Sequence, residues 1–169
     1  MPNFHEASTL FNESAERKAK ELEVVEQRAK TLTEEVVRDF RLTGDAHYNN
    51  YTFDQALQAY QRALPYVAKQ QTPQLWAAIL LDIGKTHTEL GNRTAGLDIH
   101  THLTAAVQAY NRALEVYTRE TLPQQWAMTQ NNLGTALRNQ GIRTGGERGT
   151  QLLAEAVAAY RQALEVRTR

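Results

Sequence analysis

Residues 103–119, LTAAVQAYNRALEVYTR, decide the fold because the pattern that they carry occurs three times along the chain. The pattern repeats alanine, tyrosine and alanine at three- and four-residue steps, the spacing of one helix face. A shift of fifty residues relates its copies, which are Ala56, Tyr60 and Ala63, then Ala106, Tyr110 and Ala113, then Ala156, Tyr160 and Ala163. A unit that recurs in this way buries its apolar face by stacking on its neighbours, so we expect an array of repeated units.

Each later unit also contains a second helical segment. Residues 121–141, TLPQQWAMTQNNLGTALRNQG, carry Pro123 where a first helical turn tolerates proline and Gly141 where a helix end favours glycine. Trp76 and Trp126 occupy the same position in two units, and we expect both to be core anchors. The sequence therefore predicts an all-α fold of antiparallel helix pairs.

These two segments resemble the tetratricopeptide repeat. That family carries Ala-x3-aromatic-x2-Ala on its second helix and Leu-Gly on its first, and here the first-helix pattern is found at Leu133-Gly134, at Ile83-Gly84 and more weakly around Gly44. The resemblance covers about residues 37–169 and implies a right-handed superhelix of three units, 37–70, 73–119 and 123–169. In the first unit Pro65 falls inside the second helix, which we expect it to kink.

The two later units are longer than the thirty-four residues of the family. Segments 91–102 and 141–151 lie between the helices of a unit, and we expect them to be loops that hold about ten extra residues. Units of this length resemble the arrays of bacterial, especially cyanobacterial, signalling proteins, which often accompany a caspase-like peptidase or an NTPase module. This resemblance implies an alternative function, the sensor or regulatory arm of a larger signalling protein.

Residues 1–36 do not belong to the repeat. Their apolar residues follow a three- and four-residue spacing through charged sequence, which predicts an amphipathic helix with a coiled-coil-like seam. The capping-box spacing of Thr31-Leu-Thr-Glu34 favours one helix near 6–30 and another near 32–49. Two interpretations of the seam stay open, a cap over the first repeat or self-association, and a homodimer or domain swap through the terminal helices is an expectation.

Composition narrows the classes of partner. Nineteen basic and nineteen acidic residues cancel in the net charge. The chain therefore lacks the broad positive field that would attract nucleic acids or anionic membranes. The chain has no cysteine, so disulfides and thiolate metal sites are excluded. No apolar run suits a signal peptide or a membrane span, and we expect a cytoplasmic protein.

Catalytic and metal-binding patterns are poor. His100 and His102 are the one close histidine pair, without a third ligand at useful spacing for zinc. Residues 141–150, GIRTGGERGT, are glycine-rich but lack the Lys-Ser/Thr of a phosphate loop, although Arg143 and Arg148 would attract an anion. We predict no catalytic residue, no metal ligand and no cofactor, and a metal- or anion-binding enzyme is the weakest alternative.

A peptide groove is the strongest functional expectation. In stacked helix pairs the first helices line the concave side, so residues on one face of these helices should look into it. The candidates are Arg38, Arg41, Asp45, Tyr48, Leu81, Lys85, Thr88, Met128, Asn131, Thr135 and Arg138. Four of them are cations and one is an anion, which favours a protein or peptide partner with an acidic feature. The sequence thus predicts a protein-interaction scaffold without catalysis.

Overall fold

A computed structural model describes residues 3–93, 96 and 98–167 of the protein. Throughout these residues the only regular structure is helical, which confirms the all-α fold. The elements are α1 (Phe4–Asn49), α2 (Phe53–Ala63), the short 3-10 helix η1 (Leu64–Tyr66), α3 (Pro73–Arg93), α4 (Asp98–Leu114), α5 (Pro123–Thr144) and α6 (Gly146–Arg167). Contacts divide the chain into two units, Met1–Val36 and Val37–Arg169, which are described separately.

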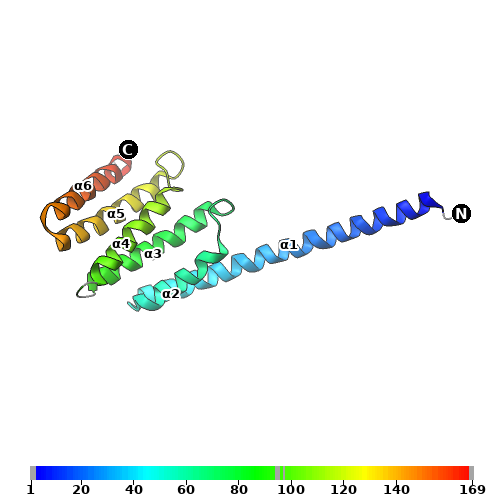
Figure 1. Ribbon diagram of the computed structural model, residues 1–169, viewed down its shortest axis with the longest axis horizontal. Coiled ribbons are helices and arrows are strands. Elements are labelled where there is room, and N and C mark those ends of the chain that lie inside the picture. The colour runs from blue at the N-terminus through cyan, green and yellow to red at the C-terminus, as the bar shows by residue number, and fades with distance from the viewer. Residues whose placement is uncertain (1–2, 94–95, 97, 168–169) are drawn as a thin grey trace. The chain divides into compact units, whose positions relative to one another are not determined.

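The compact unit Val37–Arg169 consists of three successive helix pairs, and below the first, second and third unit are these three pairs. Residues 37–49 of α1 pair with α2, α3 pairs with α4, and α5 pairs with α6. Figure 1 shows α3, α4, α5 and α6 side by side, and each packs against the next along the chain. The right-handed superhelix and the N-terminal cap stay predictions.

One glycine–tyrosine contact holds each helix pair together. A Cβ atom added to Gly44, Gly84 or Gly134 would come within about 3 Å of ring atoms of Tyr60, Tyr110 or Tyr160 respectively. Glycine is the residue that lets the first helix approach the tyrosine ring this closely. The alanines of the repeated pattern are buried on the same side of the second helices, so small residues set the distance between the paired helices.

Ion pairs between successive units follow the same fifty-residue step. Lys69, in the connection after the first helix pair, pairs with Glu115, the residue directly after α4, at 2.5 Å between Nζ and Oε2. Fifty residues later, Arg119 pairs with Glu165 of α6 at 2.8 Å. All four side chains are partly exposed, so these pairs contribute to the register of the units more than to the free energy of unfolding.

The prediction of long loops at 91–102 and 141–151 is wrong, because most of these residues extend the helices. Helix α3 continues to Arg93 and α4 begins at Asp98, while residues 94, 95 and 97 lie outside the described residues. In the third unit α5 runs to Thr144, and Gly145 alone separates it from α6. Gly145 and Gly146 have φ angles of 65° and 58°, and this left-handed backbone reverses the chain.

Gly141 lies buried inside α5 and not at the expected helix end. A Cβ atom on Gly141 would lie 2.9 Å from the carbonyl oxygen of Gly149, and one on Gly149 would lie 2.6 Å from the carbonyl oxygen of Gly141. Gly141 and Gly149 therefore bring the backbones of α5 and α6 into contact. Their role is helix packing, which a pattern of glycines in a sequence does not distinguish from a loop.

Two further expectations about helix ends are wrong. Helix α1 is continuous, and the hydroxyls of Thr31 and Thr33 donate to the carbonyls of Gln27 and Ala29 at 3.1 and 2.9 Å, so neither threonine caps a new helix. Pro65 does not kink a helix, because α2 ends at Ala63 and the proline lies in η1. In the part of the chain that the structure describes, none of the helices is apolar over a length that would cross a membrane.

Candidate functional site

A cavity of about 290 Å³ opens between α1, α3 and α5, the first helices of the three helix pairs. It is lined by one residue at the end of α1, by three of α3, by one of α4 and by three of α5. These residues are Tyr48, Lys85, Thr88, Glu89, Tyr110, Met128, Asn132 and Thr135. We call this cavity and the adjoining cluster of Arg41, Asp45 and Asp82 the groove.

Five of the eleven predicted groove residues line this cavity, namely Tyr48, Lys85, Thr88, Met128 and Thr135. Arg41 and Asp45 lie beside it in the adjoining cluster. Leu81 is buried in the core. Arg38, Asn131 and Arg138 are exposed but do not line it, and the guanidiniums of Arg38 and Arg138 contact their neighbours Asp39 and Asn139.

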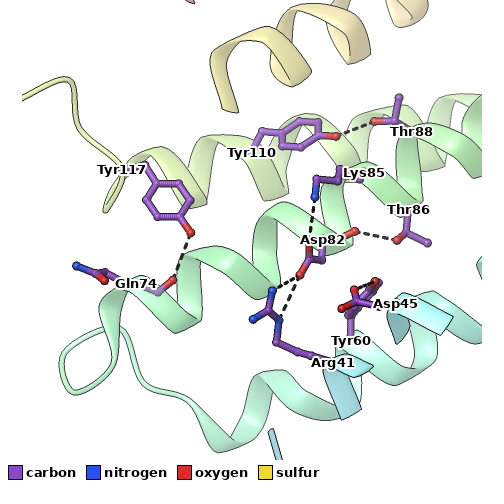
Figure 2. A network of polar contacts seen from close by, with 10 residues as sticks. All are labelled: Arg41, Asp45, Tyr60, Gln74, Asp82, Lys85, Thr86, Thr88, Tyr110 and Tyr117. Carbon is purple, nitrogen blue, oxygen red and sulfur yellow. Dashed lines mark hydrogen bonds and ion pairs between the residues drawn. The ribbon is translucent and has the colours of Figure 1, made fainter. Parts of the chain in front are cut away.

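Asp82 organises the charges of the groove, and the sequence prediction missed it. Its carboxylate accepts hydrogen bonds from Arg41 Nη2 at 2.8 Å and from Lys85 Nζ at 3.1 Å, so it joins α1 to α3. Figure 2 shows the two cations converging on Asp82 from opposite sides. Burial lowers the pKa of the Arg41 guanidinium, but the hydrogen bond and charge of Asp82 outweigh burial and leave that pKa raised.

The expected ratio of four cations to one anion is wrong for the groove as it is built. Asp82 holds Arg41 and Lys85, Glu89 adds a second acidic group to the wall, and Arg38 and Arg138 lie outside. The lining is therefore of mixed charge, with Lys85 as the cation of the cavity wall itself. A ligand would meet one ammonium group beside carboxylates, apolar side chains and amides.

Tyrosine hydroxyls from the second helices position the polar residues of the groove. Tyr110 Oη lies 3.2 Å from Thr88 Oγ1, and Tyr60 donates to Asp45 at 2.6 Å. Tyr160 Oη lies 3.1 Å from Thr135 Oγ1 in the third unit. Burial raises the pKa of the Tyr110 hydroxyl, which stays protonated at neutral pH. Each ring thus packs on its glycine and orients a groove side chain.

Burial also raises the pKa of Tyr48, and the charge of Glu89 adds to this effect. The Tyr48 hydroxyl is therefore a neutral hydrogen-bonding group at the edge of the cavity. Met128 supplies exposed apolar surface on the opposite wall. Neutral hydroxyls, an ammonium group and a thioether are groups that hold a peptide backbone and its side chains.

A larger hollow of about 520 Å³ lies in the first helix pair. It is lined by Phe40, Gln58, Gln61, Arg62, Pro65 and Tyr66. Its charged side chain, Arg62, stacks over the Phe40 ring with the guanidinium carbon 4.4 Å from the ring centroid. That cation already has a partner, and the hollow offers a ligand fewer charged groups than the groove does.

The predicted histidine pair is arranged differently. His100 and His102 lie on α4 and not in a loop, and His102 Nδ1 lies 3.0 Å from Nδ1 of His87 on α3. Burial, together with the charge of the neighbouring His102, lowers the pKa of His87 to about 4. Across the residues that the structure describes, no group of three or more potential metal ligands comes together.

Sequence signals for the missed groove residues existed. Asp82 is fifty residues before Asn132, so the two occupy one position of the repeat, and both lie at the groove. Asp82 also precedes Lys85 by three residues, the spacing of neighbours on a helix surface. A comparison of residues 82 and 132 with the predicted groove positions would have identified Asp82 as the anion that neutralises Arg41 and Lys85.

Comparison with protein-family models, with curated proteins and with solved structures finds no match for this chain.

Proposed function

We propose that residues 37–169 form a superhelical array of tetratricopeptide-like repeats that binds a protein or peptide segment in the groove. The observation that carries this proposal is the cavity wall itself, to which three successive helix pairs contribute side chains. A ligand in the groove would contact all three units at once. The repeated glycine–tyrosine contact and the repeated inter-unit ion pair support the array.

The chemistry of the wall favours a segment with an acidic group next to an apolar side chain. Lys85 is about one-third exposed and, within the described residues, has Asp82 as its hydrogen-bond acceptor, which uses one of its three donors. Met128 and the ring of Tyr48 offer apolar contacts close by. The carboxylate of a ligand would bind Lys85 while its apolar neighbour packs on Met128.

Binding without catalysis fits the hydroxyls of the groove. Thr88 donates to the carbonyl of Gly84 at 2.9 Å and lies 3.2 Å from the Tyr110 hydroxyl, so its proton is already directed to a backbone oxygen. A nucleophile needs a base within hydrogen-bond reach to take its proton. We therefore propose that these hydroxyls position a ligand.

A peptide selection with matched variants tests the proposal. A displayed library of random peptides is selected on the immobilised protein, and the dissociation constant of the best peptide is measured by calorimetry. We expect Lys85→Met and Met128→Glu to weaken binding by about tenfold or more, because each removes a contact of the wall.

Arg143→Met is the control, because it removes an exposed cation of α5 that lies outside the groove. Its peptide affinity should equal that of the parent protein. A library that yields no binder, or a peptide that binds all three variants equally, contradicts the groove as the binding surface. Circular dichroism of each variant shows that the helices are retained.

A further inference from the structure

Residues 11–36 of α1 carry an exposed apolar seam. Phe11, Leu22, Val25 and Leu32 are each more than half exposed, although they are among the most apolar residues of the helix. A seam of this length on one helix is typical of a surface that another helix covers. The groove does not use these residues, so the inference stands apart from the proposed function.

The seam follows a strict seven-residue repeat. The a positions of this heptad are Ala15, Leu22, Ala29 and Val36, and the d positions are Phe11, Lys18, Val25 and Leu32. An apolar a/d repeat sustained over more than three heptads is the pattern of a two-stranded coiled coil. Lys18 is the one charged side chain in these eight positions.

We propose that residues 11–36 pair with the same residues of a second copy of this chain, as an antiparallel two-stranded coiled coil. When the partner helix runs in the opposite direction, each a position faces a d position. A symmetric register then pairs a small with a large side chain in two layers, Ala15 with Leu32 and Lys18 with Ala29. The other two layers are apolar throughout, Leu22 with Val25 and Phe11 with Val36.

A parallel pair would fill its core poorly. Identical positions face each other in a parallel register, so Ala15 and Ala29 would each meet their own copy and leave gaps. Lys18 would face Lys18, which sets two like charges against each other in the core. In the antiparallel register the small Ala29 leaves room for the stem of Lys18 to reach solvent.

Charges flanking the seam favour the same orientation. In the antiparallel register g positions face g positions, so Glu21 of each chain lies opposite Arg28 of the other, and the two-fold symmetry makes this attractive pair twice. In a parallel register Glu21 faces Glu26, at a g and an e position, and two like-charge contacts result. Charge complementarity thus selects a second, antiparallel copy as the occupant of the seam.

The mass of the full chain in solution tests the pairing. We expect the mass measured by light scattering to rise from the monomer value of 19.1 kDa toward twice that value as the protein concentration increases through the micromolar range. Val25→Asp should return the protein to the monomer, because it places a charge in the seam. Val24→Asp is the matched control, since Val24 is the next residue and equally exposed (67% against 62%) but lies outside the seam.

A protein that stays monomeric at high concentration overturns the proposal, as does equal association of the two aspartate variants. A Val25→Asp variant that melts at lower temperature without any change of mass also overturns it, and shows that the seam caps the first repeat. Both valines are exposed on a helix surface, so neither substitution should prevent folding by itself.

Charge reversals test the orientation. In the antiparallel pair both Arg28→Glu and Glu21→Arg should weaken dimerisation by about tenfold, and the two together should restore it. Lys20→Glu, at the outer f position, should leave the dimer unchanged. A parallel pair gives the opposite result for Glu21→Arg, which would then face Glu26 and strengthen the dimer, and this outcome overturns the antiparallel register.

Discussion

The ring of Tyr110 fills the space beside Gly84, so that ring atoms lie within 3 Å of the position that a Cβ atom of residue 84 would occupy. The hydroxyl of the same ring reaches Thr88, one turn further along α3. One side chain therefore sets the distance between the helices of the pair and also fixes a residue of the groove. Packing of the helix pair and the geometry of the groove are coupled through this contact.

Gly84→Ala should lower the free energy of unfolding by about 1–3 kcal/mol, because the added methyl group overlaps the Tyr110 ring. Alanine favours a helix over glycine by up to about 1 kcal/mol, so the steric cost should decide the sign. Denaturant titration measures the change. Gly145→Ala is a comparison without a steric neighbour, whose cost of about 1–3 kcal/mol comes from its backbone angles alone, φ 65° and ψ −175°, which are essentially restricted to glycine. A Gly84→Ala protein as stable as the parent contradicts the proposed packing.

Asp82→Asn should lower the free energy of unfolding of residues 37–169 by about 1–2 kcal/mol, because Arg41 and Lys85 would then face each other without an anion between them. Both cations are about one-third exposed, so solvent screens part of the loss. Asp39→Asn is the matched control in an exposed pair with Arg38, and it should change stability by less than about 0.5 kcal/mol. Equal effects of the two substitutions in thermal melts would show that Asp82 has no special structural role.

Helix content and core positions could be predicted from the sequence because both depend on local spacing. The repeated alanines and tyrosines recur at helical steps, and Tyr60 and Tyr110 are indeed buried. The extent of the helices could not be predicted near Gly141 and Gly149. These glycines act through contacts between helices that are distant in space, whereas a sequence pattern reports only local preference.

The groove was predicted in part for a similar reason. Helix periodicity placed Lys85, Thr88 and Met128 on one face, and all three line the cavity. It could not show that Arg41, forty-one residues before Asp82, would meet that carboxylate, because such a pair depends on tertiary packing. Charges counted along a sequence therefore overstate the field that a ligand meets.

Acid should destabilise the protein through His87. Burial lowers the pKa of His87 in the folded state to about 4, against an ordinary value of 6.5. Between these pH values the unfolded chain binds a proton that the folded chain does not, so the free energy of unfolding falls as the pH decreases from about 6.5 to 4. After solvent screening we expect a loss of about 1–2 kcal/mol, measured by urea titration at each pH.

The third unit supplies a control for this effect. Leu137 and Leu152 stand fifty residues after His87 and His102, and both leucines are buried. The double variant His87→Leu/His102→Leu should therefore fit its site and remove most of the stability change between pH 6.5 and 4. An unchanged pH profile in the double variant would assign the acid sensitivity to other groups.

The two tryptophans are not equivalent, contrary to the expectation from the repeat. Trp76 is buried, and Arg112 and Lys69 lie over its ring at 5.1 and 5.7 Å from the centroid. Trp126 is only partly buried, and Arg119 lies 5.9 Å from its ring. Arg119 matches Lys69 in the repeat, but Gln162 stands where Arg112 would be matched. The third unit therefore lacks one of the two cations.

Trp76→Ala should cost about 3–5 kcal/mol of unfolding free energy and Trp126→Ala about 1–3 kcal/mol, in proportion to the burial of each ring. Gln162→Arg should raise stability by about 0.5–1 kcal/mol, because it adds the missing guanidinium over Trp126. The gain should vanish in a Trp126→Ala background, and the four proteins form a double-mutant cycle. Denaturant titrations measure each step. If Gln162→Arg stabilises the protein equally with and without the ring, the new arginine acts elsewhere on α6 and the cation–ring contact is not its cause.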